Sequence, residues 1–127
     1  MLLGVYISSS HQGLSCPDWP LCPNGFNLPP PEYFFEHVHR TLVIVTGILI
    51  FVTTLYSIKR NVKNVKKPAI IACILVIIQI LMGMLVVNSK LHAILVAIHL
   101  STGILLFSAL LMTFLFSYRN IKKSILF

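Results

Sequence analysis

Four ionisable or metal-binding side chains, Glu36, His37, His39 and Arg40, stand together where a long apolar helix is expected to begin. Ionisable groups at membrane depth are costly, and where they occur they face a partner and serve a site. Imidazoles can bind a metal, a carboxylate can relay protons, and the arginine fork suits anionic groups. The partner expected across the membrane is His99, in a later apolar run.

The spacing of these histidines from basic residues predicts their depth. His39 precedes Lys59 by 20 residues, and His99 precedes Arg119 by the same interval. At a rise of 1.5 Å per residue, both histidines should lie roughly 30 Å from the basic boundary, near the opposite surface. His92 should lie about 10 Å further out. Only one pair of histidines on different helices is therefore predicted to be level.

Two level imidazoles on different helices predict a heme held between His39 and His99. The plainer alternatives are an interfacial His39 and a His99 that is hydrogen-bonded across the bundle. His37 is expected on the other side of its helix. Glu36, one turn above His39, is expected over the heme edge, or it is simply a first-turn glutamate favoured by the helix dipole. Arg40 could anchor at the interface or pair with a heme propionate.

Small and polar residues accompany the histidines at helical spacing. Gly103 follows His99 by four residues, and Gln79 and Gly83 share one stripe of another helix. Glycine at such positions leaves room for a flat macrocycle, but it equally serves close packing of membrane helices.

Composition indicates an integral membrane protein. The 127 residues are 57% hydrophobic and 10% charged, with a mean hydropathy of +0.89. The net charge of +7 gathers at the ends of apolar runs without interleaved aromatic residues, which argues against a nucleic-acid partner and for contact with membrane lipid. The middle of the bundle lacks charged residues, which argues against a transporter.

The expected fold is all-α: a polytopic membrane four-helix bundle that forms a single membrane domain over residues 1–127. Residues 1–7 are too short to cross a bilayer. The stretch 2–8 resembles the stretch 81–88, with Gly4 matching Gly83, which indicates a repeated helix pair, and a missing upstream half-helix is the preferred account. The predicted parts are a remnant of helix 1 at 1–7, an extracytoplasmic loop at 8–36, and transmembrane helices at 37–58, 69–88 and 91–118.

Basic residues predict the orientation in the cell membrane. Five Lys and Arg residues fall within 59–67 and three more follow the last span. Positive residues are retained in the cytoplasm. The basic loop 59–67 and the C-terminus are therefore expected to be cytoplasmic, and the cysteine-bearing loop 8–36 extracytoplasmic.

Cys16 and Cys22 lie in that outer loop, where a disulfide is the expected state. The closed loop would brace a proline-rich lid that carries Trp19. A zinc site completed by His11 or His37 is the alternative, although no CxxC-type spacing exists. Cys73, within an apolar run, is expected to be inert.

Several of these motifs together resemble the heme A synthase family. They are the decapeptide 13–22, Gly-Leu-Ser-Cys-Pro-Asp-Trp-Pro-Leu-Cys, then Glu36-x-x-His39-Arg40, Gln79-Ile80 with Gly83, and His99-Leu100. The resemblance implies a four-helix unit that binds heme through His39 and His99, with Glu36 as the catalytic carboxylate and Cys16–Cys22 as a disulfide. It implies conversion of the C8 methyl of heme O to a formyl, which gives heme A for terminal oxidases.

The resemblance also implies partners and leaves alternatives. Most family members carry two such units and two histidine pairs, one for the substrate heme and one for a heme b cofactor, whereas this chain has one pair. A homodimer or homo-oligomer would restore two, and heme O synthase and a terminal oxidase are further expected partners. Ser8 and Met84 stand where the family often has arginine and a second glycine. The alternatives are a non-enzymatic b-type cytochrome that transfers electrons, and an inactive fragment or metal-free assembly protein.

Overall fold

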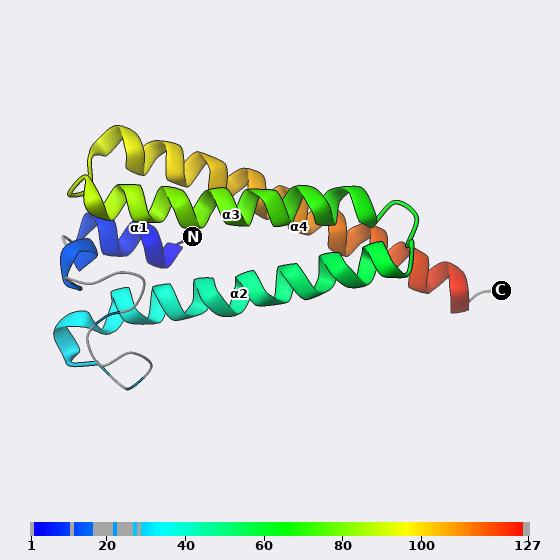
Figure 1. The fold of residues 1–127 in the computed structure, drawn as a ribbon, viewed down its shortest axis with the longest axis horizontal. Coiled ribbons are helices and arrows are strands. Elements are labelled where there is room, and N and C mark those ends of the chain that lie inside the picture. The colour runs from blue at the N-terminus through cyan, green and yellow to red at the C-terminus, as the bar shows by residue number, and fades with distance from the viewer. Residues whose placement is uncertain (1, 11, 17–21, 23–26, 28, 126–127) are drawn as a thin grey trace.

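The computed structural model describes residues 2–10, 12–16, 22, 27 and 29–125 (Figure 1). Within these residues the chain is helical and forms no strand, which confirms the predicted all-α, four-helix fold. The elements are α1 (Leu2–Ser9), the 3-10 turns η1 (Gln12–Leu14) and η2 (Pro31–Tyr33), α2 (Phe34–Lys59), α3 (Lys66–Asn88) and α4 (Ala93–Ile125).

Three helical stretches are long and apolar enough to cross a membrane: Pro31–Lys59, Lys66–Asn88 and Ala93–Ile125. Their outer faces carry large apolar side chains, such as Leu49 and Phe107, each 61% exposed. Exposed apolar surface on this scale would be untenable in water and suits contact with lipid chains.

A small apolar cluster holds the three long helices together. Ile50 of α2 packs with Ala72 and Val76 of α3 and with Ala109 of α4. The two alanines let the helix backbones approach closely, which is how helices associate where no hydrophobic effect drives them together.

The same backbone motif ends α2 and α3. After α2, Asn61 adopts a positive φ of 46°, and the Val62 N–H returns to the Ser57 carbonyl at 3.1 Å. After α3, Lys90 has a φ of 53°, and the Leu91 N–H returns to the Val86 carbonyl at 2.9 Å. These six-to-one bonds define Schellman motifs, which satisfy the last helical carbonyls and reverse the chain. The helices α2, α3 and α4 therefore run antiparallel to their neighbours in sequence (Figure 1).

The helix ends differ from the predicted ones. α2 begins at Phe34, three residues early, because Pro31 starts a 3-10 turn that continues directly into the helix. α3 begins at Lys66, three residues early, with Pro68 tolerated in its first turn. α4 begins two residues late, at Ala93, and runs to Ile125, seven residues beyond the expected end, since its basic tail contains no glycine or proline to stop it.

The short helix α1 packs against α2 and lies at the end of the bundle that holds the α3–α4 turn (Figure 1). The ring of Tyr6 meets the ring of Phe35 edge-on, with 5.2 Å between centroids. Next to α1, Gly13 lies so close to Leu91 that a side chain would come within 3.0 Å of that leucine. The chain between α1 and α2 is therefore attached to the turn between α3 and α4.

Candidate functional site

The two predicted ligands come from different helices. His39 lies in the second turn of α2 and His99 in the second turn of α4, and both are partly buried. His92 is exposed and precedes α4.

Each of the two histidines rests against a glycine of the preceding helix. A Cβ on Gly4 would stand 3.3 Å from His39 Cε1, and a Cβ on Gly83 would stand 3.7 Å from His99 Cε1. Gly4 and Gly83 are the matching glycines of the repeated stretch. The pairs α1–α2 and α3–α4 therefore present the same arrangement, a glycine on the first helix under a histidine on the second.

The backbone of His99 is held from α3. The Gln79 side-chain amide donates one hydrogen bond to the His99 carbonyl at 2.9 Å and another to Thr102 Oγ1 at 2.5 Å. Gln79 and Gly83 were expected on one stripe, and both contact the same turn of α4. Gly103 is buried one turn further along.

The histidine nitrogens suit an iron porphyrin. Among the residues that the structure describes, His99 Nδ1 is buried without a hydrogen-bond partner, and so is His37 Nδ1. Within the same residues, no cluster of three or more His, Cys, Asp or Glu side chains could cage a metal ion. A heme supplies four nitrogens of its own and asks the protein only for axial ligands. Two imidazoles on different helices, each packed beside a glycine, therefore fit a heme better than a bare metal ion.

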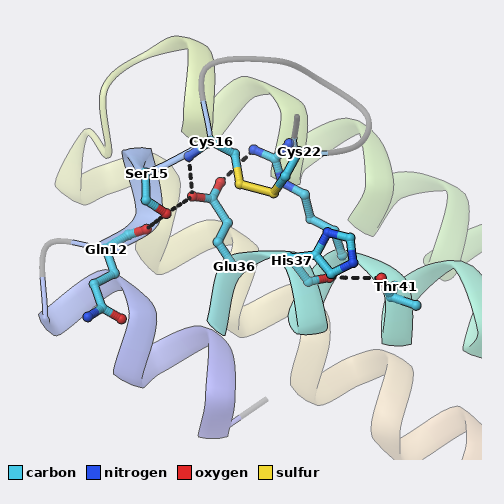
Figure 2. Close-up of a disulfide and its surroundings, with 8 residues drawn as sticks. Gln12, Ser15, Cys16, Cys22, Glu36, His37 and Thr41 are labelled. Carbon is cyan, nitrogen blue, oxygen red and sulfur yellow. Dashed lines mark hydrogen bonds and ion pairs between the residues drawn. A yellow bond between two sulfur atoms is a disulfide. The ribbon is translucent and has the colours of Figure 1, made fainter. Parts of the chain in front are cut away.

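Glu36 is 3% exposed and ties the loop to α2. Its Oε2 accepts hydrogen bonds from Ser15 Oγ at 2.8 Å and from the Cys16 backbone N–H at 3.0 Å. Its Oε1 accepts from Arg40 Nη2 in an ion pair one turn along the same helix. Figure 2 shows the carboxylate between Ser15, Cys16 and the disulfide. The side chain expected over the heme edge is thus also the attachment point of the disulfide loop.

Arg40 was expected at the interface or on a heme propionate, and in the structure its guanidinium forms an ion pair with Glu36. The side chain is largely buried, with 10% of its surface exposed. The spacing of four residues, glutamate first, is the favourable order for such a pair on a helix.

Cys16 and Cys22 form a disulfide, with 5.0 Å between their Cα atoms, and both are buried. The alternative zinc site is wrong, because the two sulfur atoms bind each other. Cys73 is a free thiol on α3. His11 and Trp19, assigned to the alternative zinc site and to the lid, lie outside the described residues.

Sequence reasoning missed two residues of this site. Ser15 belongs to the decapeptide 13–22, but no helical spacing relates it to Glu36, which is 21 residues away. Gly4 did carry a signal, because the repeated stretch aligns it with Gly83. Gly83 lies beside the candidate ligand His99, so the repeat could have predicted that Gly4 lies beside His39.

Comparison with known proteins agrees with this architecture. Residues 26–124 match the model of a family described as Cytochrome oxidase assembly protein. The chain is 35% identical over 112 residues to a heme A synthase of Lysinibacillus sphaericus, covering 84% of this chain and 36% of that protein. It is 30% identical over 134 residues to a heme A synthase of Shewanella oneidensis, covering 91% of this chain and 40% of that one.

The chain thus spans about two fifths of the length of the curated relatives that it matches. No solved structure matches it. The apolar helices and the membrane-bound relatives together make it a multi-pass membrane protein. With the family model covering most of its length and the site residues brought together, the chain belongs to the family of cytochrome oxidase assembly proteins that includes the heme A synthases.

Proposed function

We propose that this chain is a heme-binding unit of the heme A synthase type, with His39 and His99 as the axial ligands. The observation that carries the proposal is a glycine–histidine contact that occurs twice. In each helix pair, a histidine on the second helix packs on a glycine of the first. Imidazole is a common heme ligand, and two rings from separate helices can hold one macrocycle between them.

The proposed reaction oxidises the C8 methyl of heme O to a formyl, which yields heme A. Conversion of the methyl to an alcohol and then to a hydrated aldehyde, which loses water, would be overall a four-electron oxidation (R–CH₃ + H₂O → R–CHO + 4 H⁺ + 4 e⁻), and the electrons would pass to an external electron acceptor. The redox chemistry resides in the heme, and the protein contributes position and charge. Glu36 and Arg40 place a carboxylate and a guanidinium one turn above and beside His39, where they act on charge and protons at the ring edge.

The proposal also includes an orientation in the membrane and an oligomeric state. The loop that carries Cys16 and Cys22 faces outward, at the end of the bundle where both histidines lie, while the basic turn after α2 and the end of α4 face the cytoplasm. One copy supplies one histidine pair, so a second copy in a homo-oligomer supplies a second pair, one for heme O and one for heme b. Heme O synthase is the enzyme class that supplies the substrate, and a terminal oxidase consumes the product.

Heme extraction tests the proposal. The chain, produced together with a source of heme O, is purified in detergent, and its pigment is extracted and identified. We expect a Soret band and heme A in the extract. Heme b alone would instead favour a b-type cytochrome, and a colourless protein would contradict heme binding altogether.

Single substitutions assign the ligands. His39→Ala and His99→Ala should each abolish or strongly shift the Soret band, because each removes one axial ligand. His92→Ala is the matched control, since this exposed histidine precedes α4 and should leave the spectrum unchanged. If the His92 variant lost heme while the His99 variant kept it, the assignment would be wrong.

A further inference from the structure

A cluster of basic residues lies at the end of the bundle opposite to the histidines. All but two of the ten Lys and Arg residues gather there: Lys59, Arg60, Lys63, Lys66, Lys67, Arg119, Lys122 and Lys123. The three acidic residues, Asp18, Glu32 and Glu36, precede α2 or lie in its first turn. Figure 1 shows the α2–α3 turn beside the last turns of α4, so these cations come from two segments at one end.

A cavity opens between those two segments. It has a volume of about 370 Å³ and is lined by Asn64, Phe116, Arg119, Asn120 and Lys123. The turn is fixed to α4 beside it, because the Asn120 side-chain amide donates a hydrogen bond to the Lys63 carbonyl at 3.1 Å. Asn64 is held with a φ of 68°. This is an open surface pocket lined by two cations, two amides and one aromatic ring, and Asn64, Arg119 and Lys123 are exposed.

The charges in this cavity call for an anion. Arg119 and Lys123 are one helical turn apart on α4, and like charges at that spacing repel each other. No carboxylate lines the cavity beside them. A bound anion would remove this repulsion, and the arginine fork with two side-chain amides supplies the directed donors that a phosphate accepts. One N–H of Asn120 is used by Lys63, which leaves its second N–H as a donor.

We propose that this cavity binds the phosphate group of an anionic phospholipid. The cavity lies where the apolar spans end, which is the depth of lipid headgroups, and basic pockets between membrane helices are suited to such headgroups. Phe116 offers an apolar surface to the glycerol and the first methylenes of the acyl chains. A free phosphate shares the headgroup chemistry but gains nothing from that ring or from the neighbouring lipid-facing surface.

The test compares lipid binding by two variants of equal charge. Arg119→Gln with Lys123→Gln removes both cations of the cavity, whereas Lys59→Gln with Arg60→Gln removes one Lys and one Arg outside it. Full-length protein in detergent is titrated with phosphatidylglycerol and with phosphatidylcholine of the same chains, and bound lipid is counted by native mass spectrometry. We expect the first variant to lose phosphatidylglycerol affinity by about tenfold or more and the control by much less. Equal losses in the two variants would mean bulk charge and would overturn the site.

A second measurement needs no variant. Hydrogen exchange of the turn 62–65 in the unmodified protein is followed with phosphatidylglycerol, with phosphatidylcholine and with inorganic phosphate. We expect protection by phosphatidylglycerol alone. Protection by inorganic phosphate at the same concentration would replace the lipid by a free anion, and no protection by any of the three would reject the site.

Discussion

Replacing Glu36 by alanine should release the disulfide loop from α2. The substitution leaves the buried Cys16 N–H without an acceptor, which costs roughly 1–3 kcal/mol. Ser15 loses less, because its hydroxyl also reaches the Gln12 carbonyl at 2.8 Å. Removing one partner of the largely buried Arg40 adds about 1 kcal/mol. A total of about 2–4 kcal/mol corresponds to roughly a 30-fold to several-hundred-fold increase in loop opening.

A glutamine at the same position separates attachment from charge. In Glu36→Gln, the amide oxygen can still accept from Ser15 and Cys16, while its NH₂ group faces Arg40 and ends the ion pair. Loop opening should then rise far less than in the alanine variant. Glu32→Ala is the matched control, because it also removes one carboxylate but from an exposed position in η2.

The assay is hydrogen exchange in peptides that contain residues 12–16, measured in detergent, with heme content recorded on the same samples. We expect fast exchange in the alanine variant and near-normal exchange in the glutamine variant and the control. Heme A formation should fall in both position-36 variants, since both lack the carboxylate. Unchanged exchange of the Cys16 amide in Glu36→Ala would refute the anchoring role. Full heme A formation in Glu36→Gln would refute the role of the charge.

Two further predictions concern the backbone turn and the glycine seats. Lys90→Gly should raise the free energy of unfolding by about 0.5–1 kcal/mol, because glycine adopts the positive φ of this position without strain. Thermal unfolding in detergent measures this change, and a lower stability of the variant would contradict the prediction. Gly4→Ala should shift the heme spectrum more than Gly83→Ala. The new methyl would stand 3.3 Å from His39 in the first variant and 3.7 Å from His99 in the second. Equal spectral shifts would contradict this difference in packing.

Helical spacing in the sequence was enough to predict which residues share a helix face in part of the site. The 3.6-residue period placed Gln79 and Gly83 on one face of α3, and the structure brings both to the turn of His99. The same period placed Glu36 one turn from His39, but the ion pair between Glu36 and Arg40 was not predicted.

The loop contacts could not be predicted, for a physical reason. An irregular segment between two helices has no period that relates its residues to a distant side chain. The Ser15 and Cys16 donors reach Glu36 across 20 residues or more of chain. Helix ends were misjudged where a polar sequence stayed helical, as at the basic end of α4, because hydropathy marks the membrane and not the helix.

The repeated glycine and histidine seats have a consequence for a flat ligand with unlike edges. Two identical halves would give such a ligand no reason to prefer one facing over the reversed one. The bridges between the halves' helices do differ: 10–33 joins α1 to α2, whereas the short turn 89–92 joins α3 to α4. A preferred facing would therefore come from features that only one half carries: Glu36 and Arg40 on α2, the Gln79 contact with His99, and the longer bridge with its disulfide.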